Sequence, residues 1–236
     1  MAVIPYEPKQ IEKGEETMSK KLIKQSLGES IANIIRERII LGEYPPGMKL
    51  KEEQFAEEFE LSRICVREAL LILDREGLLD KKLNRGSCVC NHSAKDVEDL
   101  LSYRVVLEVA AAVGCIEKGC VPKRELSECI EKMDRLRNEE TPSAEFLEAD
   151  IVFHDTLIHA LGNEYIDISW DAVRSQYLML MNALYKVRSF EFHEDGRYGH
   201  SKLLNLLLSG DKEKLTELLR LHIMSNCESI SRFVCD

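Results

Sequence analysis

Ten consecutive residues decide the fold of the first part of the chain: Leu61-Ser62-Arg63-Ile64-Cys65-Val66-Arg67-Glu68-Ala69-Leu70. Ser62 is a residue type that caps helices and Gly77 is one that ends them, so the pattern predicts a helix over 63–76. The apolar residues of this stretch recur at helical spacing and share one face: Val66, Ala69, Leu70 and Leu73. Arg63 and Arg67, one turn apart, lie beside that face.

The flanking sequence completes a small domain. Apolar periodicity predicts a helix over 27–41, which Gly42 and the following prolines end, and a shorter helix over 52–59. Only Glu60 and Leu61 separate the second helix from Ser62, which is typical of a helix-turn-helix. Downstream, 78–82 and 87–90 are expected to be two short strands around a turn at 83–86. The sequence therefore predicts a winged helix-turn-helix over 21–92, after a flexible arm over 1–20.

These motifs resemble the DNA-binding domain of GntR-type bacterial transcription regulators. The resemblance rests on the ten residues above, on Glu76-Gly77-Leu78 and Arg85-Gly86, and on the lead-in Ile39-Ile40-Leu41-Gly42-Glu43-Tyr44-Pro45-Pro46-Gly47-Met48-Lys49-Leu50. Three residues depart from the family pattern. Cys65 replaces the usual Pro or Thr, Glu60 replaces the usual Gly of the turn, and Glu53 stands where the family often has a DNA-contacting Arg.

The physical chemistry agrees with DNA binding. A recognition helix enters the major groove by its N-terminal end, and arginine can pair with two acceptors of guanine, which suits Arg63 and Arg67. Basic residues of the wing are suited to phosphate or minor-groove contact. The full set of expected DNA-binding residues is Ser62, Arg63, Arg67, Lys81, Lys82, Arg85 and Gly86. The expected partner is double-stranded operator DNA.

The charge of the chain is unevenly distributed. There are 32 basic and 42 acidic side chains in 236 residues, a net charge of −10. Residues 20–92 carry 13 basic and 12 acidic side chains, whereas residues 93–236 carry 17 and 26, so only the first part is suited to approach a polyanion. No apolar run reaches the roughly 18 residues of a membrane span. The eight irregularly spaced cysteines favour reduced thiols, and we expect a cytoplasmic protein with no membrane partner.

From Ser93 onward the pattern is helical. Helices are expected over 94–118, 123–138, 142–160, 163–187, 196–209 and 211–232. Short connections favour an antiparallel bundle with a central cavity. The fold class is therefore mainly α: an N-terminal winged helix-turn-helix and a C-terminal all-α bundle over 93–236. We expect the bundle to bind an effector and to dimerise, because a palindromic site needs two recognition helices.

Four polar residues fall on helix faces that should be buried. Asp150 and His154 lie one turn apart within an apolar stripe, and His200 and His222 lie on leucine-rich faces of two further helices. One carboxylate and three neutral imidazoles suit a divalent transition metal such as Zn²⁺, Ni²⁺, Mn²⁺ or Fe²⁺. The other three histidines, His92, His159 and His193, fit no such pattern.

This joint pattern resembles the FCD subgroup of GntR regulators. In that subgroup an all-helical effector domain has an Asp-x-x-x-His pair, a His in the penultimate helix and a His in the last, places filled here by Asp150, His154, His200 and His222. Tyr103-Arg104-x-x-Leu107-Glu108 is similar to the "R-x-x-L-E" of its first helix. The resemblance implies that Arg104 faces the cavity and binds a small organic acid as effector. The alternative for Arg104 is a surface ion pair with Glu108.

The leading hypothesis is a metal-containing, ligand-responsive transcription regulator that is not an enzyme and binds DNA as a homodimer. A metal-dependent hydrolase or lyase that uses the Asp/His cluster is a first alternative, although no additional carboxylate stands out beside the four ligands as a general base. A thiol-based redox sensor that uses Cys65, Cys88 or Cys90 is a second. There is no Gly-rich phosphate loop and no nucleophile elbow.

Overall fold

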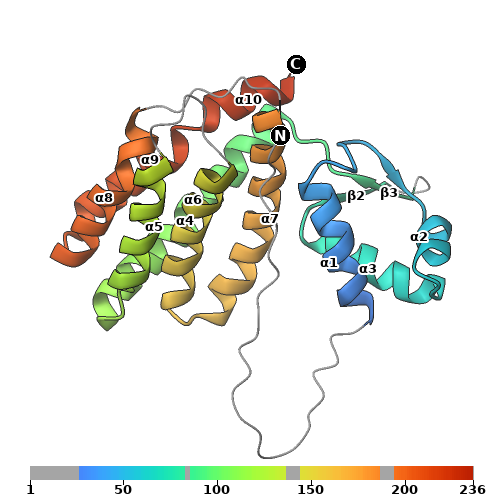
Figure 1. Cartoon of the computed structure of the whole chain (residues 1–236), viewed down its shortest axis with the longest axis horizontal. Helices are drawn as coiled ribbons and strands as arrows, with labels where there is room; N and C mark the ends of the chain where they lie inside the picture. Colours follow the sequence, from blue (N-terminus) through green and yellow to red (C-terminus); the bar gives the residue numbers. More distant parts are fainter. Residues whose placement is uncertain (1–26, 83–85, 137–143, 187–193, 236) are drawn as a thin grey trace, which may run out of the picture. The chain divides into compact units, whose positions relative to one another are not determined.

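A computed structural model of the chain describes residues 27–82, 86–136, 144–186 and 194–235. The expected arm over 1–20, most of the turn at 83–86, and His193 lie outside these residues. The chain divides between Asn91 and His92 into two compact units, each with its own core (Figure 1). The mainly helical fold class expected from the sequence is confirmed.

The first unit contains the three expected helices. They are α1 (Leu27–Ile40), α2 (Glu52–Glu58) and α3 (Arg63–Arg75). The apolar face of α3 is buried as the periodicity predicts, and it packs on α1 and α2. Its buried partners are Ile31, Ile35 and Ile39 of α1 and Phe55 of α2. Arg36 Nε also donates to Glu76 Oε2 at 2.7 Å, which ties α1 to the end of α3.

The wing is a three-stranded antiparallel sheet. It consists of β1 (Lys49–Leu50), β2 (Leu79–Lys82) and β3 (Gly86–Val89), in the order β1-β3-β2. The hairpin of β2 and β3 was expected from the sequence, but β1 was not. A strand of two residues is too short to show an alternation of apolar and polar side chains. It forms because Lys49 and Leu50 pair with Cys88 and Ser87.

The turn between α2 and α3 holds one residue in an unusual conformation. Glu60 has a φ of 54°, the left-handed region that favours glycine. The next helix begins directly afterwards, where the Ser62 side chain accepts a hydrogen bond from the Cys65 backbone N–H. The glutamate that departs from the family pattern therefore occupies a position whose backbone suits glycine.

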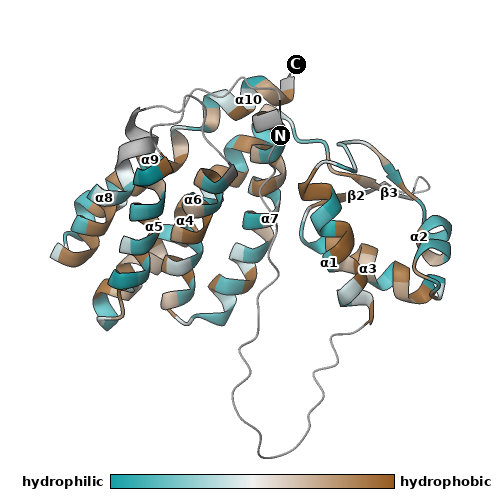
Figure 2. Ribbon diagram, viewed as in Figure 1, coloured by the Kyte–Doolittle hydropathy of each residue, from teal (hydrophilic) through white to brown (hydrophobic). Residues whose placement is uncertain are grey.

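The second unit is an antiparallel helical bundle (Figure 1). Its helices are α4 (Ala94–Lys118), α5 (Lys123–Leu136), α6 (Ala144–Ala160), α7 (Glu164–Lys186), α8 (Glu194–Ser209), α9 (Lys212–Met224) and α10 (Cys227–Cys235). α4 is central, since it packs against α6, α7, α8, α9 and α10. α5 covers α6 and α8 and shows many hydrophilic residues along its length in Figure 2. Within the described residues, no helix combines the length and the apolar character needed to span a membrane.

One expected helix is in fact two. The sequence predicts a single helix over 211–232, but the structure breaks it between α9 and α10 at Ser225 and Asn226. Ser225 Oγ donates to the carbonyl oxygen of His222 at 2.7 Å, and Asn226 Nδ2 donates to the Tyr177 hydroxyl at 3.5 Å. These polar contacts end α9 and begin a short last helix that packs against α4 and α7.

Glu60→Gly should stabilise the winged unit. A left-handed conformation costs a residue with a side chain about 1 kcal/mol, and glycine avoids that cost. We expect the free energy of unfolding, measured by urea or heat, to rise by about that amount. Glu57→Gly, at an exposed position in the last turn of α2, is the matched control and should lower the free energy of unfolding. An equal loss of stability in both variants would contradict the role given to this turn.

Candidate metal and effector site

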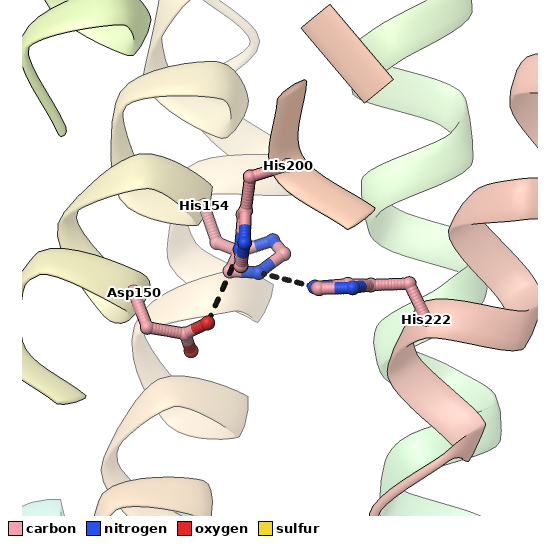
Figure 3. A group of neighbouring side chains, drawn as sticks. All are labelled: Asp150, His154, His200 and His222. Carbon is pink, nitrogen blue, oxygen red and sulfur yellow. Dashed lines mark hydrogen bonds and ion pairs between the residues drawn. The ribbon is translucent and has the colours of Figure 1, made fainter. Parts of the chain in front are cut away.

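Four side chains from three helices meet inside the bundle, as the sequence predicts. Asp150 and His154 come from α6, His200 from α8 and His222 from α9, and they point toward one another (Figure 3). One candidate ligand atom from each residue lies within 4.8 Å of all the others. Ligands bound at about 2.1 Å from one ion lie at most about 4.2 Å apart, so small side-chain movements would suffice for all four to bind it.

Converging ring nitrogens support a cation at this cluster. Among the described residues, the buried His200 Nε2 has no hydrogen-bond partner, and it faces the cluster. His222 Nε2 faces His154 Nε2 at 3.3 Å, and His200 Nε2 lies 3.1 Å from Asp150 Oδ1. Each buried unpaired polar atom costs about 1–3 kcal/mol, and a divalent cation would take up the converging lone pairs. The residues present therefore fit a metal ion.

Burial sets the protonation of the candidate ligands. It lowers the pKa of His222 well below the ordinary histidine value, and it lowers the pKa of His200 despite the opposing effect of Asp150. Both imidazoles are then neutral at pH 7, as metal ligands must be. Burial acts to raise the pKa of Asp150, but the bond with His200 holds it below its usual range.

A buried carboxylate orients one of the histidines. Glu108, on α4 and fully inaccessible to solvent, accepts a hydrogen bond from His154 Nδ1 at 2.5 Å. Because a carboxylate only accepts, His154 carries its proton on Nδ1 and leaves its Nε2 lone pair for the cluster. Arg104 Nε donates to the other oxygen of Glu108 at 2.6 Å. Burial acts to raise the pKa of Glu108, but Arg104 and then His154 keep it below the usual value.

This role of Glu108 was not predicted from the sequence. The alternative considered for Arg104 was a surface pair with Glu108; the pair exists, but both residues are buried. The expectation that no additional carboxylate stands beside the ligands is also wrong, since Glu108 binds His154 directly. The detectable signal was that Arg104 and Glu108 fall within the apolar stripe of α4, at helical spacing from Leu100, Leu101 and Ala111.

A pocket adjoins the cluster. Its lining combines apolar and polar side chains: Arg104, Leu147, Asp150, Tyr177, His222, Ile223 and Asn226. The Arg104 guanidinium lies 4.3 Å from the centre of the Tyr177 ring, which fixes it against α7. Arg104 thus faces a cavity that includes two of the candidate ligands. Tyr177 and Asn226 were not expected there, because nothing in the sequence of α7 marks this tyrosine as different from its apolar neighbours.

The expected DNA-binding residues lie in the other unit. Arg63 and Arg67 project from α3 with exposed side chains, and Ser62 caps the helix. Lys81 and Lys82 are on β2, Gly86 begins β3, and Arg85 lies outside the described residues. Glu52 and Glu53 of α2 form ion pairs with the two arginines.

Among the described residues, the other histidines and the cysteines take no part in the cluster. His92 Nε2 lies 3.2 Å from Gln176 Oε1, and His159 Nδ1 lies 2.8 Å from Asp167 Oδ1, so both belong to local polar pairs. The cysteines whose side chains the structure describes are free thiols. Ser62 Oγ lies 3.2 Å from the Sγ of Cys65, at the start of α3.

A winged helix-turn-helix combined with a helical bundle that encloses a cluster of polar side chains defines a class of DNA-binding regulators. The family model described as "Bacterial regulatory proteins, gntR family" matches residues 27–89 of the sequence. The family model of the FCD domain matches residues 99–225. The chain belongs to the GntR family of transcription regulators, with an FCD domain as its second unit.

Similarity to individual proteins supports this family assignment. The chain is 31% identical to the gluconate operon transcriptional repressor of Bacillus subtilis over 75% of its own length and 72% of that protein. It is similar in structure to a putative GntR regulator of Rhodococcus sp. RHA1, with 26% identity and a TM-score of 0.69 over 86% of this chain and 96% of that one. E. coli McbR/YncC shares the fold at 20% identity and a TM-score of 0.71, over 88% and 98% of the two chains. The relatives are transcription regulators and not enzymes.

Removing metal should destabilise the bundle. An ion present at 1,000 times its Kd stabilises the folded state by about 4 kcal/mol, so chelation should lower the melting temperature measured by calorimetry. His222→Ala should abolish binding of Zn²⁺ or Co²⁺. Glu108→Gln should weaken binding about 10- to 100-fold, because it disturbs the hydrogen bond that orients His154.

His159→Ala is the matched control, since it removes a histidine of α6 outside the cluster, and it should bind metal like the parent. Metal binding that survives in a His200→Ala/His222→Ala double variant would rule out the site.

Proposed function

We propose that this chain is a homodimeric, metal-containing transcription regulator that binds operator DNA through α3 and responds to a small carboxylate in its bundle. The observation that carries the effector site is the pocket whose lining includes Arg104 together with Asp150 and His222. The operator DNA of a bacterium lies in the cytoplasm, and we expect the protein to act there.

The exposed side of α3 is suited to the major groove. The side chains of Arg63 and Arg67 are 63% and 60% exposed, while Val66 between them is fully buried. Each arginine has the paired donors that guanine O6 and N7 accept. Ile64, 77% exposed on the same turn, is suited to contact a thymine methyl group. The positions of Lys81 and Lys82 on the wing strand β2 support phosphate contacts.

The dimer is proposed to form through the bundle. α4 exposes Tyr103 and Val106, and α7, which packs against α4, exposes Tyr165 and Ile168. Apolar side chains left on the surface of neighbouring helices favour burial against a second copy. A two-fold dimer presents two recognition helices, so its operator should be an inverted repeat.

Selection of bound duplexes from a randomised library should therefore yield inverted repeats that contain guanine in each half. Arg63→Ala and Arg67→Ala should each weaken binding to the selected operator about 10- to 100-fold, as loss of a two-acceptor contact requires. The melting temperature should stay unchanged because both side chains are exposed.

Arg124→Ala, an exposed arginine of α5, is the control for loss of positive charge. If both α3 variants bound the operator with the affinity of the parent, α3 would not be the helix that recognises the base sequence. Selected sites without two-fold symmetry would contradict the dimer.

The effector pocket is suited to a carboxylate. Arg104 supplies guanidinium donors, and Tyr177 and Asn226 supply a hydroxyl and an amide on the same lining. A divalent ion at the Asp/His cluster would add a Lewis-acidic position for a second anionic or hydroxyl oxygen. A relative named for the gluconate operon makes a hydroxy acid a reasonable first probe.

Gluconate and a panel of small hydroxy acids should be compared with glucose, which lacks the carboxylate. We expect at least one acid, and not glucose, to raise the melting temperature of the metal-loaded protein. The Arg104→Lys variant keeps a positive charge beside Glu108 but lacks the planar guanidinium with its paired donors. It should weaken binding of that acid about tenfold, as measured by calorimetry, while metal still binds. Equal affinity in the variant and the parent would remove Arg104 from the effector site.

A further inference from the structure

The first turn of α2 places two carboxylates on the two arginines of the recognition helix. Arg63 Nη1 donates to Glu53 Oε1 at 2.9 Å. Arg67 makes a two-bond pair with Glu52, with Nε donating to Oε1 at 3.0 Å and Nη2 to Oε2 at 2.7 Å. Both arginines of the proposed DNA-reading surface are therefore already paired within the protein.

These pairs contribute little to the fold. Three of the four side chains are more than half exposed and that of Glu52 is 30% exposed, and exposed ion pairs stabilise proteins by only about 0–1 kcal/mol. The first turn of α3 has no acidic residue of its own, so the counter-charges come from the neighbouring helix. What the pairs do determine is the charge that this surface presents to DNA.

The pairing of Arg67 has the geometry of base recognition. Its Nε and Nη2 face two acceptor oxygens, as a guanidinium faces O6 and N7 of guanine. A guanine edge can therefore replace the carboxylate bond for bond. A phosphate can also accept from the arginine, but a DNA backbone brought to this surface meets the negative charges of Glu52 and Glu53 as well.

We propose that Glu52 and Glu53 set the sequence specificity of this regulator by neutralising Arg63 and Arg67 toward DNA of arbitrary sequence. Non-specific binding depends on the phosphate charge alone, so two carboxylates beside the arginines weaken it most. A correct site offers base-edge acceptors that compensate for the displaced carboxylates, and its affinity is reduced less. This inference rests on the proposed reading of DNA by α3.

The test compares the parent with a Glu52→Gln/Glu53→Gln double variant. Affinity is measured for the selected operator and for a scrambled duplex of the same length and composition, between about 50 and 200 mM salt. We expect the variant to bind the scrambled duplex about tenfold more tightly, with a salt slope steeper by about one to two units, one for each arginine released to phosphate. Operator affinity should rise less, so the ratio of the two affinities falls.

The control is Glu57→Gln/Glu60→Gln, which removes the same charge from exposed positions in α2 and the following turn. It should leave the ratio and the slope at the parent values. The proposal is overturned if the Glu52/Glu53 variant keeps the parent ratio, or if the control lowers the ratio equally, since net charge alone would then be responsible.

These outcomes are distinct from failure of the DNA-reading proposal. In that case the Arg63→Ala and Arg67→Ala variants would bind the selected operator like the parent. Melting temperatures of both glutamine variants should match that of the parent, which shows that altered binding does not arise from unfolding.

Discussion

A single buried carboxylate connects two helices of the FCD domain. Glu108 has no contact with solvent and is compensated by Arg104 on its own helix and by His154 on α6. Loss of one partner from such a buried pair costs about 3–5 kcal/mol, because the remaining charge is left in a medium of low dielectric constant. Glu108 thus links α4 to α6, sets the tautomer of His154 and holds one side of the Arg104 guanidinium, whose other contact is the Tyr177 ring. One candidate metal ligand and one pocket residue are positioned by the same group.

The two units use the same pair of residue types to opposite effect. In the bundle an arginine–glutamate pair is buried, and solvent cannot compete for either partner. On α3 the pairs of Arg63 and Arg67 are exposed, and water can compete with the glutamates at little cost. Burial, and not the identity of the residues, decides whether the pair fixes a structure or serves as a replaceable counter-charge.

Periodicity was sufficient for most of the helices and for the four clustered residues, because Asp150 and His154 fall within an apolar stripe and His200 and His222 lie on leucine-rich faces. It did not reveal the partners that only tertiary packing supplies. On α4 the charged Arg104 and Glu108 lie in the buried stripe of the helix, but the helical period does not show that His154 of α6 pairs with Glu108. The break after α9 was equally hidden, since Ser225 and Asn226 end that helix through a side-chain contact with its own backbone and a bond to Tyr177 on α7.

All four candidate metal ligands belong to one polypeptide. An ion held by these four side chains would be bound once per chain and would not bridge two copies. The fraction of chains that carry metal would then depend on the concentration of free ion and not on the concentration of a second chain. Metal could in that case be acquired by a single newly folded chain, before it meets another copy.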